Sequence, residues 1–95
     1  MNGAFHQEEK TAIAPGDVVV SLMGRDRGSL LLVVEQSAAF LLVADGKRRP
    51  LARPKRKNRR HLALCQKAPF SQTPPTDRAL RRALRALKEP PEQPT

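Results

Sequence analysis

Residues 17–35 have the sequence DVVVSLMGRDRGSLLLVVE, in which two apolar segments enclose a short polar loop. Both segments are short and rich in β-branched residues, which is typical of β-strands. Gly24 and Gly28 bracket the loop and can adopt backbone angles that other residues avoid. The sequence therefore predicts two strands joined by a compact turn, in which these glycines have a structural role.

The tip of this predicted hairpin is basic. Arg25 and Arg27 flank Asp26, whose carboxylate can accept hydrogen bonds from turn amides or pair with a neighbouring arginine. A plain surface hairpin is one interpretation. Two arginines at the apex favour a loop that contacts phosphate.

A third strand is predicted over residues 40–44 (FLLVA), after a turn in the sequence QSAA. The three segments are apolar on both faces, which fits strands with both sides covered, as in a small barrel closed on itself. Their lengths and the flanking turn signals argue against short helices. The predicted fold class is mainly β.

The dipeptide Asp45-Gly46 is a strong hairpin signal, because a type I′ turn needs positive φ angles. A fourth strand is therefore expected near residues 47–51. Pro50 and Pro54 would restrict that strand to an edge of the sheet.

The sequence HLALCQK, residues 61–67, predicts a fifth strand in which Cys65 serves as a small apolar residue. A single cysteine excludes an intramolecular disulfide and favours a reducing compartment. Between the fourth and fifth strands, PKRKNRR is expected to be a loop.

A helix is predicted over residues 76–89, with leucines at helical spacing and arginines around them. Thr76 or Asp77 caps its start, and Pro90-Pro91 stop it. Three roles stay open: the leucines pack on the barrel, the arginines add a second RNA-binding surface, or the helix binds a membrane surface or a partner.

These segments predict one small domain with flexible ends. The expected divisions are a tail (residues 1–14), a barrel (15–68) with a basic loop (47–60), a linker (69–75), the helix (76–89) and a disordered tail (90–95).

The segment 47–60 (KRRPLARPKRKNRR) contains nine of the eighteen lysines and arginines and no acid. Charges this dense repel one another, and an anionic partner relieves the repulsion. Together with a net charge of +9 and a pI of about 11.1, this favours a polyanion such as nucleic acid.

Other functions find little support in the sequence. We expect no catalytic residues, no metal site and no cofactor, because the two histidines, one cysteine and scattered carboxylates assemble no known constellation. The N-terminal residues do not resemble a signal peptide, and no apolar run could span a bilayer. A cytoplasmic monomer without membrane contact is expected.

The order strand, Gly24-Arg25-Asp26-Arg27-Gly28, strand resembles the KOW motif of ribosomal proteins and transcription elongation factors. Asp45-Gly46-Lys47, the sequence PKRKN and His61-Leu62 extend the resemblance to a bacterial family of small KOW-domain RNA-binding proteins. That family is similar to large-subunit ribosomal protein fourteen of archaea and eukaryotes. The chain departs from the family pattern at Arg48 and Pro50. The resemblance covers residues 15–87 and implies an SH3-like barrel that binds RNA, as part of the ribosome or beside ribosomal proteins.

By this resemblance, the loop 24–28 and the PKRKN segment are the expected RNA contacts. Together with the basic segment they give the predicted RNA-binding residues Arg25, Arg27, Lys47, Arg48, Arg49, Arg53, Lys55, Arg56, Lys57, Arg59, Arg60 and His61. The chain has three phenylalanines and no tyrosine or tryptophan, so it lacks the aromatic platforms that stack single-stranded bases. We therefore expect it to recognise structured RNA, with ribosomal RNA the first candidate, by shape and phosphate contacts.

Two other classes remain possible from the sequence. A KOW-type barrel can serve as a protein-interaction module of the transcription or translation machinery. The segment PKRKNRR could also act as a nuclear-localisation or DNA-binding peptide.

Overall fold

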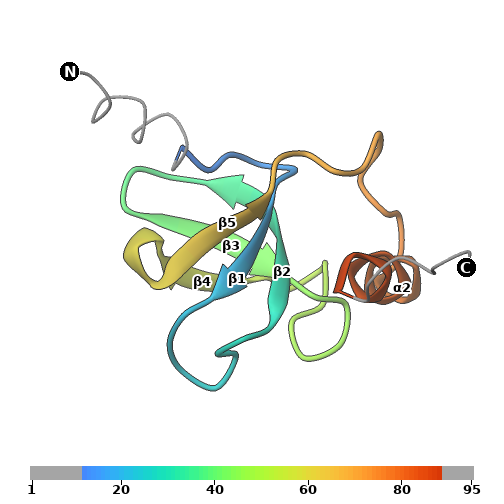
Figure 1. Ribbon diagram of the computed structural model, residues 1–95, viewed down its shortest axis with the longest axis horizontal. Coiled ribbons are helices and arrows are strands. Elements are labelled where there is room, and N and C mark those ends of the chain that lie inside the picture. Colours follow the sequence, from blue (N-terminus) through green and yellow to red (C-terminus); the bar gives the residue numbers. More distant parts are fainter. Residues whose placement is uncertain (1–11, 89–95) are drawn as a thin grey trace, which may run out of the picture.

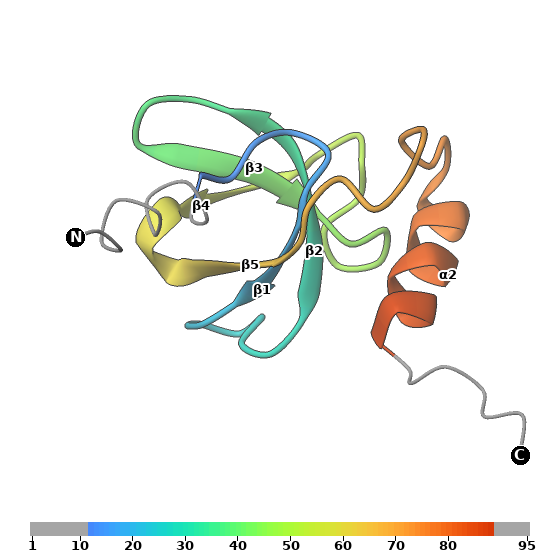
Figure 2. The same cartoon turned by 45° about the horizontal axis from the view of Figure 1, so that its top comes forward.

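The computed structural model describes residues 12–88, which form a five-stranded antiparallel sheet in the order β4-β3-β2-β1-β5 and one C-terminal helix (Figure 1). The elements are β1 (Val18–Ser21), β2 (Leu30–Gln36), β3 (Phe40–Ala44), β4 (Lys55–Asn58), a 3₁₀ turn η1 (Arg59–His61), β5 (Leu62–Gln66) and α2 (Asp77–Lys88). The predicted mainly-β fold with a C-terminal helix is confirmed. The sheet curves into a small barrel-like globule, and η1 joins its two edge strands β4 and β5 (Figure 2).

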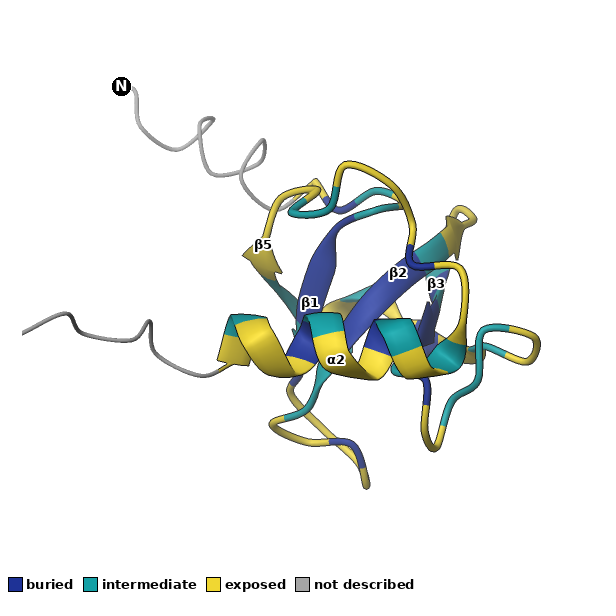
Figure 3. Ribbon diagram, turned by 90° about the vertical axis from the view of Figure 1, so that its right-hand side faces the viewer, coloured by how far each residue is buried: buried dark blue, intermediate teal, exposed yellow. Residues whose placement is uncertain are grey.

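Apolar side chains on the two faces of the sheet form two separate cores. Because side chains alternate along a strand, Val19 on β1 and Leu31 on β2 point into the barrel, whereas Val18 and Leu32 point to the outside. We expected closure of the barrel to bury both faces of the strands. It buries only the inner face, and α2 covers the outer cluster (Figure 3).

The helix packs by the leucines that its spacing predicts. Leu80 and Leu84 are buried against β1 and β2, and Leu87 is partly buried beside them. Thr76 caps the helix by accepting a hydrogen bond from the Ala79 amide at 3.0 Å. The predicted last residue of the helix and the two tails lie outside the described residues, except for residues 12–14.

Those three residues do not behave as the predicted tail. Ile13 is only 6% exposed and belongs to the core inside the barrel. The Ala14 amide donates a 2.8 Å hydrogen bond to the carboxylate of Asp17, which fixes the chain where it enters β1. The barrel therefore begins earlier than the Pro15-Gly16 turn signal indicates.

The predicted fourth strand at residues 47–51 is wrong, since β4 begins at Lys55. Gly46 has a φ of +81°, but Asp45 does not share the positive φ that a type I′ turn requires. The Asp45 carboxylate instead accepts hydrogen bonds from the amides of Lys47 and Arg49, at 2.8 and 2.9 Å. This local bonding favours a wider turn, and the strand resumes only after Pro54.

Asp17 ties the beginning of the barrel to its end. Its carboxylate is buried and accepts hydrogen bonds from Lys67 Nζ at 2.7 Å and from the Ala68 amide at 2.9 Å, besides the bond from Ala14. Burial by itself raises the pKa of Asp17. The hydrogen bonds from Lys67, Ala14 and Ala68 and the charge of Lys67 outweigh burial, so the pKa lies below its ordinary value.

We expect Asp17→Asn to lower the free energy of unfolding at pH 7 by about 2 kcal/mol, because it weakens charge-assisted hydrogen bonds. A carboxylate with a lowered folded-state pKa stabilises the fold above its unfolded-state pKa, about 3.9, and this stability is lost as the pH falls through the folded-state pKa. Urea unfolding from pH 7 to pH 2.5 should therefore show a smaller loss of stability for the variant. The exposed Glu35, replaced by Gln, provides the control. Parallel pH profiles for wild type and Asp17→Asn would contradict this role.

Candidate nucleic-acid interface

The basic segment 47–60 is folded in three different ways. Residues 47–54 form turns, β4 contributes Lys55 to Asn58, and η1 follows with Arg59, Arg60 and His61. The expectation of a single loop, and of PKRKNRR as unpaired chain, is therefore wrong. Strand β4 pairs antiparallel with β3, which places Lys57 opposite Leu41 and Arg56 opposite Leu42. Strand alternation then decides which cations face solvent.

Lys57 points inward and is only 9% exposed. Its ammonium donates hydrogen bonds to Ser21 Oγ at 3.0 Å and to the Met23 carbonyl at 3.1 Å, and it lies 3.9 Å from an Asp26 carboxylate oxygen. Lys57 therefore connects β4 to the end of β1. We predicted that Lys57 contacts RNA, but its ammonium is buried and does not reach the surface.

Asp26 also turns away from the residues beside it. Its side chain is 3% exposed and pairs with Arg49 at 3.3 Å as well as with Lys57. The expected partners were turn amides or the adjacent arginines. Arg25 and Arg27 are instead left exposed at the tip of the loop, and Asp26 joins this loop to the turn before β4.

We expect Asp26→Asn to lower the free energy of unfolding by about 3 kcal/mol, because it leaves the buried Lys57 without its carboxylate. In urea unfolding, the double variant Asp26→Asn/Lys57→Met should lose less than the two single variants together, with a coupling of about 1 kcal/mol or more. Strictly additive losses would show that the 3.9 Å separation carries no coupling.

We use the name basic face for the exposed cations of this segment and of the loop 24–28, which come from several elements of the fold. Its exposed members are Arg25, Arg27, Lys47, Arg48, Arg53, Lys55, Arg56 and Arg60. Arg59 and His61, which were also predicted to contact RNA, are half-buried. Arg59 donates a long 3.5 Å hydrogen bond to the Ser37 carbonyl, and the His61 carbonyl accepts one from the Leu22 amide at 2.8 Å.

Two contacts fix the shape of this face. The Arg56 guanidinium lies over the Phe40 ring, with its carbon 4.7 Å from the ring centre, which is cation–π geometry. The Asn58 side chain caps η1 by accepting a 2.9 Å hydrogen bond from the Arg60 amide. Both contacts reduce the conformational freedom that the cations would lose on binding.

The carboxylates that lie among these cations are engaged within the protein. Asp26 is in its ion pairs, Asp45 accepts two turn amides, and Asp77 accepts the Leu51 amide at 2.7 Å. The sequence left open whether Asp77 caps the helix, and its carboxylate serves the basic segment instead. Of these three carboxylates only Asp26 is buried in ion pairs, so the exposed cations outnumber the carboxylates near them.

The predicted turn glycines adopt the expected conformation. Gly24 and Gly28 both have a φ of +85°, and hydrogen bonds from the Arg27 amide to the Gly24 carbonyl and from the Gly28 amide to the Ser21 carbonyl close the loop. Gly46 has a different requirement, because a Cβ there would collide with the Asp77 carbonyl oxygen of α2.

The remaining candidates give no second kind of site. Cys65 lies in β5 as expected but is exposed, so it does not pack as an apolar residue. Within residues 12–88, no three histidine, cysteine or carboxylate side chains gather in a way that could hold a metal ion. Over the same range no helix has the length and apolar character needed to cross a membrane.

Helix α2 adds cations that our list of RNA-binding residues left out. Arg81 donates a 2.7 Å hydrogen bond to the Gly46 carbonyl, and with Arg85 and Lys88 it borders a cavity next to Lys47. Their spacing of four and three residues was the signal in the sequence, since such residues share one face of a helix.

Comparison of the chain with protein-family models and with curated proteins found no match. The case for a function therefore depends on the residues and on their arrangement.

Proposed function

We propose that this protein binds structured RNA, with ribosomal RNA the foremost candidate, by docking its basic face on phosphates. The observation that carries the proposal is the excess of exposed positive charge: eight exposed cations outnumber the carboxylates near them, of which Asp26 is buried in ion pairs and Asp45 and Asp77 accept backbone amides. A surface with one sign of charge attracts a polyanion and speeds its association.

The type of side chain favours shape recognition over base sequence. Most of the exposed cations are arginines, whose planar guanidinium groups make paired hydrogen bonds to phosphate. Phe40 is half-buried and covered by Arg56, and Phe70 packs against the cluster under α2. No free aromatic platform is present among residues 12–88, so stacking on bases would fall to arginine.

The resemblance to KOW-domain proteins supports the same ligand. A strand, a loop carrying two arginines and a second strand are the features of the motif, and here they form one side of a barrel-like sheet. We infer a ribosomal or ribosome-associated protein that acts as a monomer in the cytoplasm and performs no chemistry.

The test is a binding titration that compares a ribosomal RNA hairpin, an unstructured RNA of equal length and a DNA duplex. We expect the hairpin to bind most tightly. If about six cations contact phosphate, log K should fall with log salt with a slope of roughly −4 to −5. Tightest binding to the DNA duplex, or a marked preference among single-stranded sequences, would overturn the proposal.

A sucrose gradient of native lysate tests the ribosomal assignment separately. Co-migration with the large subunit at low salt, released at high salt, is the expected result. Protein found only at the top of the low-salt gradient would exclude stable association with the ribosome.

One observation favours a protein-interaction module as a second candidate. Leu22 and Met23 are 46% and 52% exposed and directly precede the loop 24–28. Exposed apolar residues of this size are common in protein interfaces. A protein partner bound independently of salt, and lost on replacing both residues by serine, would support this alternative.

A further inference from the structure

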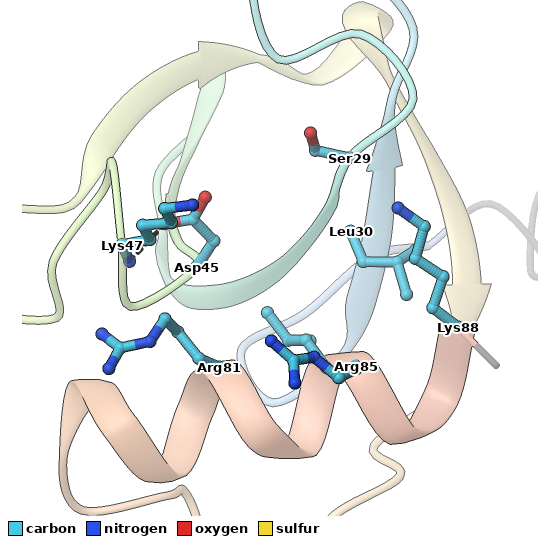
Figure 4. A pocket seen from close by; sticks show the side chains of 8 residues that line it. Ser29, Leu30, Asp45, Lys47, Arg81, Arg85 and Lys88 are labelled. Atoms are coloured by element: carbon cyan, nitrogen blue, oxygen red, sulfur yellow. Dashed lines mark hydrogen bonds between the residues drawn. The ribbon is translucent and has the colours of Figure 1, made fainter.

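A cavity of about 230 Å³ lies between α2, the start of β2 and the turn after β3 (Figure 4). One wall is a single face of the helix, formed by Arg81, Leu84, Arg85 and Lys88. These positions are three or four residues apart, so their side chains rise together from the helix.

The opposite wall comes from two segments distant in sequence. Leu30 begins β2 and Ser29 precedes it, and Asp45 and Lys47 belong to the turn after β3. Leu30 packs in the same apolar cluster as Leu84. The cavity therefore combines an apolar patch with a polar border.

The charge of that border is strongly positive. Lys47, Arg81, Arg85 and Lys88 line the cavity together with one carboxylate, that of Asp45. The Asp45 carboxylate accepts the amides of Lys47 and Arg49, which hold it in place, and the four cations still outnumber it. Arg81 is held in place by its hydrogen bond to the Gly46 carbonyl.

We propose that this cavity binds a nucleoside phosphate, with the phosphoryl group among the cations and the base against Leu30 and Leu84. Four cations around one opening favour a group with several anionic oxygens. The volume is below the roughly 300–1,000 Å³ of pockets that enclose drug-sized ligands, which suits a single nucleotide that is partly exposed.

Such a nucleotide has two possible sources, a free mononucleotide or one unit of an RNA strand. Both present the same phosphate and base. The inference does not depend on RNA binding by the basic face, since Lys47 alone is common to the two sites.

The test uses the isotope-labelled full chain and two variants with equal loss of charge. Arg85→Ala/Lys88→Ala removes cations that line the cavity. Arg78→Ala/Arg82→Ala removes two exposed arginines of the same helix that do not line it. Alanine is the best helix former, so both variants retain α2.

The probes are AMP, adenosine, inorganic phosphate and a short single-stranded RNA, followed by NMR amide shifts. We expect AMP or the RNA to shift the amides of Leu30, Leu84 and Lys88, and to do so at lower concentration than adenosine or phosphate. The cavity variant should weaken this binding about tenfold or more, and the control less than about twofold.

The outcomes separate the sources and can overturn the proposal. Shifts with AMP indicate a free nucleotide, and shifts with RNA alone indicate a strand. Equal losses in the two variants would reduce the effect to net charge, and absence of shifts with both probes would exclude the site. A variant of the basic face that loses RNA but keeps AMP distinguishes failure of the proposed function from failure of this inference.

Discussion

Replacement of four exposed cations of the basic face by glutamine is expected to weaken binding of structured RNA by about a hundredfold or more near 0.1 M salt. The slope of log K against log salt should become shallower by about three to four units, because four fewer phosphate contacts release fewer counterions. The four residues are Arg53, Lys55, Arg56 and Arg60. Fluorescence anisotropy with a labelled hairpin, repeated at several salt concentrations, measures both quantities.

Pairs of substitutions distinguish contact from general attraction. Arg56→Gln/Arg60→Gln and Arg78→Gln/Arg82→Gln remove the same charge, the first pair from the basic face and the second from α2. We expect the first pair to change the slope by about two units and the second by much less. Equal effects of the two pairs would remove the basic face from the interface.

A substitution at Lys57 provides a contrast within the same strand. Its ammonium is bonded to Ser21 and Met23 and is nearly inaccessible. Lys57→Met should therefore reduce stability and leave the salt slope close to that of the wild type. Lys57 and its neighbour Arg56 differ in exposure because side chains alternate along β4. The composition of the segment alone does not predict this difference.

The parts of the fold that depend on local patterns were predictable. Signals within a few residues of one another predicted these parts. They are the apolar segments of β1, β2 and β3, the glycines of the loop 24–28 and the leucine spacing of α2. Short-range signals of this kind do not require knowledge of which segments meet.

Several of the wrong predictions concern contacts between distant segments. Asp26 meets Arg49, and Lys57 meets Ser21, which are separated by 23 and 36 residues. The prediction of a tight hairpin after β3 was wrong for a local reason. The Asp45 carboxylate accepts hydrogen bonds from the amides of Lys47 and Arg49, which a tight hairpin would leave to pair between strands. The second apolar face looked like barrel closure because the sequence does not say what covers it.

The basic segment shows the same limit for function. Its charge predicts an anionic partner, and that inference needs only composition. Which cations are available depends on the register of β4 against β3 and on the carboxylates nearby. The cavity beside α2 also depends on tertiary structure, since it exists only where the helix meets the turn 45–49.

We expect Gly46→Ala, at the contact between α2 and the turn 45–49, to lower the free energy of unfolding by about 3 kcal/mol. Gly46 is buried with a φ of +81°, which costs an alanine about 1 kcal/mol. A Cβ at this position would also collide with the Asp77 carbonyl oxygen and lie 3.2 Å from Arg81 Cγ. Overpacking of this kind costs about 1–3 kcal/mol more. Urea unfolding measures the total.

Gly28→Ala separates the two contributions. Gly28 has a φ of +85°, but a Cβ there would meet nothing within 4 Å. We expect only the backbone cost, about 1 kcal/mol, and normal protection of the α2 amides from hydrogen exchange. In Gly46→Ala the same amides should exchange faster, because relief of the collision moves the helix away from the barrel. Equal losses in the two variants would show that the close approach of α2 contributes nothing. Faster exchange combined with unchanged RNA binding would place the basic face and the helix in separable parts of the fold.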